Sequence, residues 1–426
     1  MPIPIERISV CNLLSFGESA EPLELRPLNV LIGINGSGKS NLIETIALLA
    51  SMNSPRGMSG YIGQSGGIFN WLWKGTEAAP IAKLDVSGGL LDGRHFEHQI
   101  AFTRVGQSIE AVDESVSVRP QGKRHPRKPL FSYENGVPVL RDKRRPKPLS
   151  RQDINFTQSI LWEDQPAEVA YNLSPLSRLY RSFRIYLMSN IDNAKHPQQP
   201  DLPSGYLTPD ATNLGAVLSR LMMRKALRKL LFKKLNTFYP EFEELFVNTQ
   251  TGTLQIYFQE SDLFSPVPAT RSSDGTLRWL CLLAILLDPE PPPLVCIEEP
   301  EMGLHPDIVV ELAELLREAS TRMQLIVTTH SSTLVDGLTG TPQDVIVCEK
   351  YQGSTRLRRL DAVDLRDWLV PYSLGELWRR GQIGGNRWRV SQSTSKAAEL
   401  GSPSPNAGRD SGVFSNASYP GKTTSQ

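Results

Sequence analysis

The sequence has few of the features that mark secreted, metal-binding or membrane proteins. Its four cysteines, in 426 residues, lie singly, with no CxxC pair and no histidine at metal-ligand spacing. Isolated cysteines of this kind are typical of buried thiols in a reducing compartment. The N-terminus lacks a basic segment followed by an apolar stretch, and no run of about 18 apolar residues occurs. We therefore expect a cytoplasmic protein with no membrane partner.

Net charge is also nearly absent, since 46 basic residues face 45 acidic ones and the formal charge is +1. A nucleic-acid signal must therefore be local. Two segments are locally basic: residues 119–151, which prolines break into an expected exposed loop or hairpin, and one face of the helix expected around residues 220–234. Together they could form a surface for DNA or RNA. The alternative is solvated charge balanced by acids elsewhere.

Short apolar segments alternate with helical ones near both ends of the chain. We expect strands at 5–10, 28–32, 294–297 and 324–328, and helices at 41–50, 276–287 and 309–319. This alternation is typical of an α/β fold whose mostly parallel sheet is covered on both faces. Between these parts, 81–112 alternates like antiparallel strands, and Leu214 to Phe246 carries a helical apolar stripe. After Val390 the composition predicts a disordered tail.

A phosphate-binding loop is the strongest motif. Residues Gly33-Ile-Asn-Gly-Ser-Gly-Lys-Ser40 fit G-x-x-x-x-G-K-[ST], between an expected strand and an expected helix. Its backbone N–H groups and the helix N-terminus are suited to phosphates, Lys39 should reach the β- and γ-phosphates, and the Ser40 hydroxyl should bind Mg²⁺. The residues expected to contact ATP are Asn35, Gly36, Ser37, Gly38, Lys39 and Ser40.

Three further residues supply the chemistry that such a loop requires. Glu298 and Glu299 end an apolar strand, and because neighbouring strand residues point to opposite sides, the two acids should differ in role. We expect Glu298 to hold Mg²⁺ and Glu299 to orient or deprotonate the attacking water. His330 follows the next buried strand and could contact a γ-phosphate. Taken alone, the acidic pair would be interpreted as a solvated strand end, and His330 as an ordinary histidine.

The four segments GINGSGKS, SSDGTLR, CIEEPEMGLHP and TTHS, taken in order, resemble the ABC-type ATPases of the RecF/SMC-like group. This group includes predicted ATPases related to the overcoming-lysogenization-defect proteins. The resemblance covers residues 1–75 and 265–360. It implies a P-loop NTPase fold of the ABC-type head class, with a mixed, mostly parallel sheet and an inserted α/β lobe.

The resemblance also implies a dimer. Residues 272–275 correspond to the signature loop, in which Ser273 and Gly275 would contact ATP held by a second subunit, so that two copies sandwich the nucleotide. Residues 301–306 match the D-loop that crosses this interface, and Asn35 fits the family's P-loop preference. The glutamine of the Q-loop, a metal contact, has only a positional candidate in Gln64. Ser273 could equally be a helix N-cap, and both roles are compatible.

These observations predict four parts: 1–75 and 265–390 as the two halves of the ATPase core, an inserted lobe at 76–264, and the tail at 391–426. The lobe should be β-rich at 80–150 and helical at 205–247. Its apolar stripe is too short for a long coiled coil. No Toprim nuclease pattern is found, so a nuclease or other effector would be a separate polypeptide. Residues 374–385 resemble a tail element of related ATPases and are expected to cap the core.

Three functions remain open at this stage. The first is an ATP-driven switch that dimerises around ATP, acts in DNA metabolism or anti-phage defence, and controls nucleic-acid contact or a separate effector. The second is the ATPase subunit of an ABC transporter, which the SSDG signature, the large insertion and the missing Q-loop disfavour. The third is a nucleotide-dependent binding scaffold whose hydrolysis is incidental.

Overall fold

The computed structural model describes residues 2–18, 21–120, 128–134, 136–141, 146–150, 154–162, 167–189, 191–200, 205–250 and 252–385. The tail predicted to be disordered, 391–426, lies outside these residues. The described residues fall in a single compact unit.

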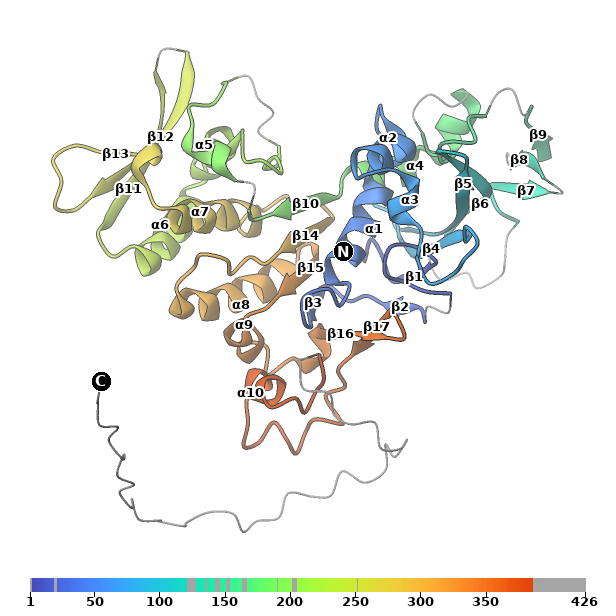
Figure 1. Cartoon of the computed structure of the whole chain (residues 1–426). Helices are drawn as coiled ribbons and strands as arrows, with labels where there is room; N and C mark the ends of the chain where they lie inside the picture. The colour runs from blue at the N-terminus through green and yellow to red at the C-terminus, as the bar shows by residue number, and fades with distance from the viewer. Residues whose placement is uncertain are drawn as a thin grey trace, which may run out of the picture. The chain divides into compact units, whose positions relative to one another are not determined.

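A six-stranded sheet forms the centre of this unit (Figure 1). Its strands, in spatial order, are β10 (Arg184–Leu187), β14 (Leu294–Glu298), β15 (Gln324–Thr329), β3 (Leu28–Ile32), β16 (Val345–Tyr351) and β17 (Ser354–Arg359). The first five are mutually parallel, and β17 pairs antiparallel with β16. The predicted mixed, mostly parallel sheet is confirmed.

Helices cover both faces of this sheet. Successive side chains of a strand point to opposite sides, so each strand contributes apolar side chains to two cores. Val30 and Ile32 of β3 face one apolar core, and Leu31 faces another. The first core contains α7 (Asp274–Leu286), α8 (Pro306–Ser320), α9 (Ser332–Asp336) and α10 (Leu374–Arg379). The second contains α1 (Lys39–Ser51), α2 (Gly57–Gln64), α3 (Ile68–Trp71) and α4 (Ala167–Arg181). Buried on both faces, the strands are nearly all apolar.

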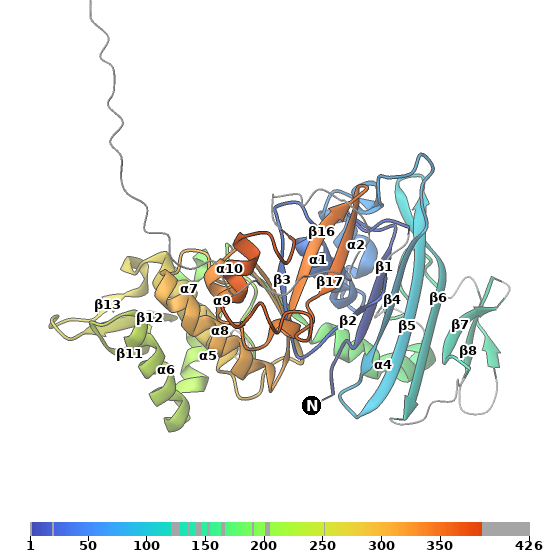
Figure 2. The same cartoon turned by 90° about the horizontal axis from the view of Figure 1, so that it is seen from below.

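An eight-stranded antiparallel sheet packs beyond the second core (Figure 2). Its order is β2 (Leu23–Glu24), β1 (Arg7–Cys11), β4 (Ala82–Gly89), β5 (Arg94–Val105), β6 (Ser108–Pro120), β7 (Phe131–Glu134), β8 (Val137–Arg141) and β9 (Pro146–Pro148). The strands expected at 81–112 are present. Since β1 pairs with β4, this sheet joins residues from both sides of the predicted boundary at 75. The division into four parts stays a prediction.

The single helical stretch predicted from Leu214 to Phe246 is wrong. The structure has two helices, α5 (Leu214–Met222) and α6 (Lys225–Phe238), followed by a sheet of β11 (Phe242–Gln250), β12 (Thr253–Glu260) and β13 (Val267–Pro268). Arg224 is extended, which separates the helices. Pro240 disfavours helix at the residue before it, and the residues that follow pair with β12 instead. The helical part of 205–247 therefore ends at Phe238.

Short elements complete the described chain: the 3₁₀ turns η2 (Asp192–Lys195), η3 (Ala269–Arg271) and η4 (Pro342–Asp344). Sequence patterns did not predict α2, α4 or β10. Among the helices of the described ranges, none has the length and apolar character needed to cross a membrane.

Candidate nucleotide site

The P-loop connects β3 to α1, as its motif predicts. Gly38 has a φ of 104°, a left-handed conformation that favours glycine, and it precedes the first residue of α1. Lys39 is 5% exposed, and its Nζ donates to the carbonyl oxygens of Gly33 at 2.9 Å and Ile34 at 3.1 Å. Asn35, Gly36 and Ser40 are exposed, whereas Ser37 is buried. The loop is thus folded around the lysine ammonium.

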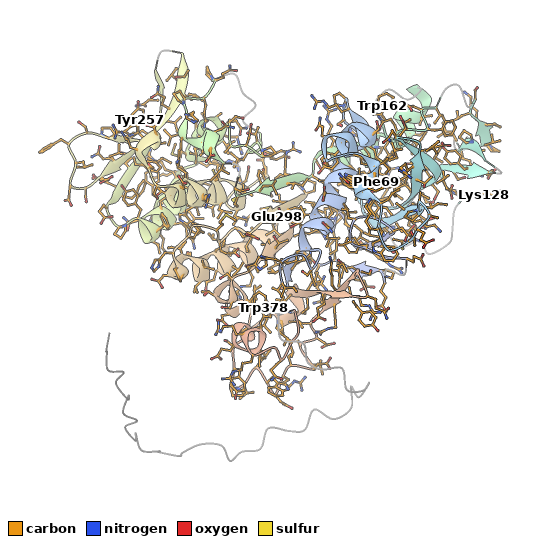
Figure 3. The ribbon with its side chains drawn as sticks, in the orientation of Figure 1. Phe69, Lys128, Trp162, Tyr257, Glu298 and Trp378 are labelled. Atoms are coloured by element: carbon orange, nitrogen blue, oxygen red, sulfur yellow. The ribbon has the colours of Figure 1, made fainter. Side chains whose placement is uncertain are left out.

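Glu298 and Glu299 lie at the carboxyl end of β14, which Figure 3 marks at Glu298. Glu299 leaves the strand with a φ of 45°, which is uncommon for a residue with a side chain. Its N–H donates to the carbonyl of Thr328 at 3.0 Å, which fixes the turn against β15. In the described part of the chain, Oε1 of Glu298 is buried without a hydrogen-bond partner. An unpartnered buried carboxylate oxygen is costly unless a ligand satisfies it.

His330 lies at the carboxyl end of β15, beside Glu299. Its Nε2 is 3.5 Å from Oε1 of Glu299. Burial, reinforced by the positive charge of Lys39, lowers the pKa of His330, and Glu299 opposes this shift. The imidazole is therefore favoured in its neutral form, in which one ring nitrogen can donate and the other can accept a hydrogen bond.

Glu301 holds the histidine segment in place. Its Oε1 accepts hydrogen bonds from Thr329 Oγ1 at 2.6 Å and from the backbone N–H of His330 at 2.9 Å. Burial raises the pKa of Glu301, and these hydrogen bonds counteract it. The sequence placed Glu301 in a D-loop match and did not predict this contact.

These residues converge because β14, β15 and β3 are adjacent parallel strands, so their carboxyl ends share one edge of the sheet. Burial lowers the pKa of Lys39, and the nearby Glu299, Glu298 and Glu301 counteract this effect. The structure thus brings together the P-loop, both acids and His330. Open α/β sheets bind ligands at this edge.

Glu44 is a further carboxylate near the site that the sequence patterns did not predict. Burial and the charge of Glu298 raise the pKa of Glu44, and burial and Glu44 in turn raise the pKa of Tyr61 to about 12. Glu44 follows Ser40 by four residues, about one helical turn along α1. That spacing was the signal that could have identified it.

The signature segment is separate from the P-loop within one chain. Ser273 caps α7 by accepting a hydrogen bond from the N–H of Thr276 at 3.0 Å, so the N-cap role is confirmed. Asp274 is paired with Lys195. No hydrogen bond or ion pair between 272–275 and the P-loop is found in the described ranges. The start of α7 instead contacts residues 302–303, which lie in the segment that resembles a D-loop.

Residues 299–305 pack closely on helix α7. A Cβ placed on Gly275 would lie 2.7 Å from the carbonyl oxygen of Gly303, so only glycine permits this approach. Arg278 Nη1 donates to the carbonyl of Met302 at 3.1 Å. The loop of residues 299–305 therefore touches α7 on one side and, through Glu301, the His330 segment on the other.

Gln64, the positional candidate for a metal contact, lies exposed at the end of α2. Among the residues described, it has no hydrogen bond or ion pair with the P-loop or the acids. Nothing in its surroundings supports it over other residues.

The donor atoms of the site fit Mg²⁺ with a nucleotide. Glu298 offers a buried, unpartnered oxygen, and Ser40 is exposed at the start of α1. Across the described ranges, no group of three or more His, Cys, Asp or Glu residues could hold a metal by itself. Mg²⁺ commonly binds through one or two carboxylates plus phosphate oxygens and water, so this small donor set is suited to it.

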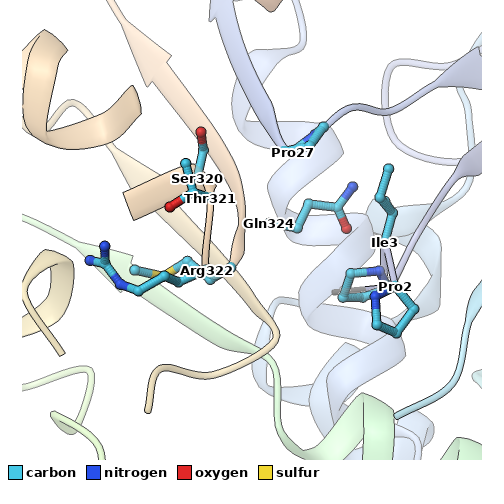
Figure 4. Close-up of a pocket in the computed structure, with 9 residues that line it drawn as sticks. Pro2, Ile3, Pro27, Ser320, Thr321, Arg322 and Gln324 are labelled. Atoms are coloured by element: carbon cyan, nitrogen blue, oxygen red, sulfur yellow. The ribbon is translucent and has the colours of Figure 1, made fainter. Parts of the chain in front are cut away.

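A pocket of about 200 Å³ lies at the other end of the strands (Figure 4). Pro27 precedes β3 and Gln324 begins β15, so the pocket is at their amino ends. The side-chain amide of Gln324 is hydrogen-bonded to the backbone of Ile5 and Arg26. The pocket is therefore not part of the candidate nucleotide site.

The predicted basic surface is only partly described. In 119–151, residues 121–127, 135, 142–145 and 151 lie outside the described residues, and Arg119 and Arg141 form ion pairs with Glu97 and Glu134. On 220–234, four of the basic residues pair with acids: Arg220, Arg224, Arg228 and Lys234. Lys225, Lys229 and Lys233 are exposed, without an ion pair in the described chain.

The tail element, 374–385, packs on the core. Helix α10 has a capping box of Ser373 and Glu376, and Leu374 and Leu377 are fully buried beside α9. Trp378, labelled in Figure 3, donates from Nε1 to the carbonyl of Gly385 at 3.2 Å. Gly385 donates from its N–H to Oε1 of Glu349 at 2.8 Å.

Comparison with known proteins decides the family. Residues 28–336 match a family model described as "AAA domain, putative AbiEii toxin, Type IV TA system", which is more than half of the chain. The protein belongs to this family. With its P-loop motif and its mostly parallel sheet, it is a P-loop ATPase domain of this family. A search of curated proteins found no match.

Solved structures of SMC heads share the fold. An SMC head bound to the C-terminal winged-helix domain of ScpA has a TM-score of 0.55 at 16% identity, covering 84% of this chain and 98% of that chain. A Pyrococcus furiosus Smc head with an extended coiled coil, bound to the C-terminal domain of ScpA, has a TM-score of 0.50 at 15% identity, covering 87% and 99%. At such identities the likeness shows the fold alone.

Proposed function

We propose that the protein binds ATP with Mg²⁺ and hydrolyses it, and that two copies close around the nucleotide. The observation that carries this proposal is the meeting of Lys39, Glu298, Glu299 and His330 at one edge of the parallel sheet, with His330 Nε2 3.5 Å from Glu299 Oε1. Phosphoryl transfer is catalysed mainly by positioning and by stabilising charge, and these residue types supply both.

Each residue has a distinct role in this proposal. The P-loop residues Asn35 to Ser40 bind the phosphates, with Lys39 as the cation. Ser40 and Glu298 hold Mg²⁺, which supplies charge neutralisation at the phosphates. Glu299 orients or deprotonates the attacking water, and the neutral His330 donates a hydrogen bond toward the γ-phosphate position. Gln64 remains a candidate metal contact by position only.

The dimer follows from the signature segment. Ser273 is exposed and Gly275 half-buried at the start of α7, and in the described chain neither has a hydrogen bond or ion pair with the P-loop. In a head-to-head homodimer they would face the nucleotide of the second copy. The loop of residues 299–305, held by Arg278 and Glu301, would then lie at the interface between the two sites.

The biological setting is DNA metabolism or anti-phage defence, with control of nucleic-acid contact or of a separately encoded effector. The family description names a toxin of a type IV toxin–antitoxin system, which supports a defensive role. The SMC heads of similar fold bind domains of ScpA, a separate protein. That arrangement supports a separate effector here. Both Lys-rich α6 and the 119–151 segment are candidates for DNA or RNA contact.

Glu299→Gln tests the proposal. It keeps the shape of the side chain but removes the base, so hydrolysis should fall about 100-fold or more while ATP still binds. In ATP and Mg²⁺ we expect the Glu299→Gln protein to be a dimer by size-exclusion chromatography with light scattering. Without ATP and Mg²⁺ we expect it to be a monomer. Glu314→Gln, the same change on an exposed residue of α8, is the control and should hydrolyse ATP like the wild type. Unchanged hydrolysis in Glu299→Gln would refute the catalytic assignment.

A readout of partner signalling, added for the same variant, separates the alternatives. A binding scaffold with incidental hydrolysis would dimerise in ATP but would signal to its partner equally well with wild-type protein and Glu299→Gln. No observation specifically supports a transporter subunit, so we do not propose that function.

A further inference from the structure

A chain of polar side chains ties the P-loop to two distant segments. Asn41 Nδ2 lies 2.6 Å from Ser15 Oγ, and Ser15 Oγ lies 2.6 Å from Thr355 Oγ1. Thr355 Oγ1 in turn lies 2.8 Å from the carbonyl oxygen of Ser37. The chain thus begins in the first turn of α1, passes through the loop after β1 and through β17, and ends inside the P-loop.

The Thr355 hydroxyl is the link between the loop after β1 and the P-loop. An amide NH₂ can only donate and a carbonyl oxygen can only accept, whereas each hydroxyl has one proton. Asn41 donates to Ser15 Oγ, and Thr355 Oγ1 is placed to donate either to Ser15 Oγ or to the Ser37 carbonyl oxygen. Ser15 Oγ and the Ser37 carbonyl therefore share one donor.

Both hydroxyl-bearing segments are themselves anchored. The backbone N–H of Thr355 donates to the carbonyl of Ser15 at 2.8 Å, and Ser354 Oγ accepts from the N–H of Gly17 at 2.8 Å. Thr355 is 5% exposed. The hydroxyl of Thr355 is therefore held where it is by bonds that do not involve the P-loop.

The fit around Gly38 is close. A Cβ on Gly38 would lie 2.1 Å from Thr355 Oγ1 and 2.7 Å from Ser15 Oγ. The glycine is thus required by this approach as well as by its positive φ. Residue 38 sits directly against the hydroxyl pair.

The bond to Ser37 sets the direction of the next N–H group. The Ser37–Gly38 peptide is trans, as are the other described peptides. In a planar trans peptide the C=O and the following N–H point in opposite directions. Since the Ser37 carbonyl is held toward Thr355, the N–H of Gly38 points away from the hydroxyl pair.

We propose that Ser15 and Thr355 are positioning residues for nucleotide binding: their hydroxyls orient the Ser37–Gly38 peptide so that its N–H is preset for a phosphate oxygen. This inference rests on the proposed ATP binding and adds two residues that no motif contains. Neither hydroxyl contacts the acids or His330. Their removal should therefore weaken nucleotide binding more than it slows the chemical step.

Thr355→Val is the first test, because valine keeps the branched shape and lacks the hydroxyl. ATP affinity, measured by titration with a fluorescent ATP analogue and Mg²⁺, should fall about tenfold, since a buried carbonyl loses its donor. In steady-state assays the loss should fall mainly on KM and less on kcat. Thr355→Ser restores the hydroxyl and should bind within about twofold of the wild type.

Ser15→Ala and the double variant test the chain itself. Because Ser15 Oγ is linked to the Ser37 carbonyl only through Thr355, Ser15→Ala with Thr355→Val should weaken binding no more than about twofold beyond Thr355→Val alone. The control is Thr103→Val, which removes a threonine hydroxyl bonded to the carbonyl of Pro80 in the antiparallel sheet and should not change ATP affinity.

The outcomes are distinct. If wild-type protein binds no ATP, the proposed function fails. If it binds ATP and Thr355→Val binds equally well, the positioning role is wrong. It is equally wrong if Thr355→Ser is as weak as Thr355→Val, because the hydroxyl would then not be the cause, or if the two variants weaken binding additively. A melting temperature recorded without nucleotide shows whether each variant is folded.

Discussion

At the scale of single residues, the site holds one side chain in an unfavourable backbone conformation. Glu299 has a φ of 45°, where the Cβ crowds the backbone. Such conformations cost about 1–2 kcal/mol in non-glycine residues and persist where the surroundings impose them. The hydrogen bond from its N–H to Thr328 and the contact with His330 are those surroundings. The strain is consistent with a position kept for its chemistry.

Glu299→Gly should therefore stabilise the fold while abolishing hydrolysis. Glycine accepts the positive φ at little cost, so the melting temperature should rise by about one to two degrees. Glu299→Gln is the matched control: it also loses the carboxylate but keeps a Cβ, and it should melt like the wild type. Differential scanning fluorimetry without nucleotide measures both. A Glu299→Gly protein that melts below Glu299→Gln would contradict the strain argument.

At the scale of elements, residues 374–385 are bound to the core by apolar burial. Leu374, Leu377, Trp378 and Ile383 are each at most 8% exposed. Burial of a large apolar side chain contributes about 1.5–3 kcal/mol. The segment should thus be a structural part of the ATPase unit, although it follows the last strand.

Two truncations test this. A chain that ends after Val390 removes only the predicted disordered tail and should keep the wild-type melting temperature. A chain that ends after Ser373 also removes the four buried side chains, so it should melt at least about ten degrees lower or fail to fold. Thermal melts of both proteins are the measurement. If the shorter chain melts like the longer one, the segment does not support the core.

Elements differ in how far the sequence predicts them. The strands 28–32, 294–297 and 324–328 were predicted nearly to the residue, because each is a short apolar run that ends in a functional motif. Helix α4 was missed, since it carries Pro175 and follows no motif. The break at Arg224 was missed because the apolar stripe runs through both α5 and α6. The turn to β11 is decided by pairing with β12, which no local pattern reveals.

At the scale of the whole molecule, the site depends on contacts that no spacing rule encodes. The P-loop, Glu298, Glu299 and His330 could be predicted together because parallel strands end at one edge of a sheet. Ser15 and Thr355 are 340 positions apart and meet only through the packing of β17 beside the P-loop. Glu301 was placed in a motif, but its bond to His330 required the fold. The sequence therefore predicts the residues expected to carry the chemistry. It does not predict the residues that hold them in position.

Because the whole molecule is nearly neutral, any binding of DNA must depend on a local basic surface, and α6 carries one. Lys225, Lys229 and Lys233 follow one another at four-residue intervals, about 6 Å apart along one helix face. Their neighbours Arg224 and Arg228 are already paired with acids, which leaves these amines for phosphates. If the protein binds DNA through α6, this row should carry much of the electrostatic contact.

Replacing all three lysines with glutamate should weaken binding to duplex DNA at low salt and reduce the slope of log affinity against log salt by about three, because each lysine released one counterion. Lys229→Glu alone should show about a third of this change in slope. Lys83→Glu, the same substitution on an exposed residue of β4, is its control and should leave the slope unchanged. Fluorescence anisotropy at several salt concentrations gives both quantities. Equal affinities and slopes for wild type and the triple variant would exclude α6 as the contact.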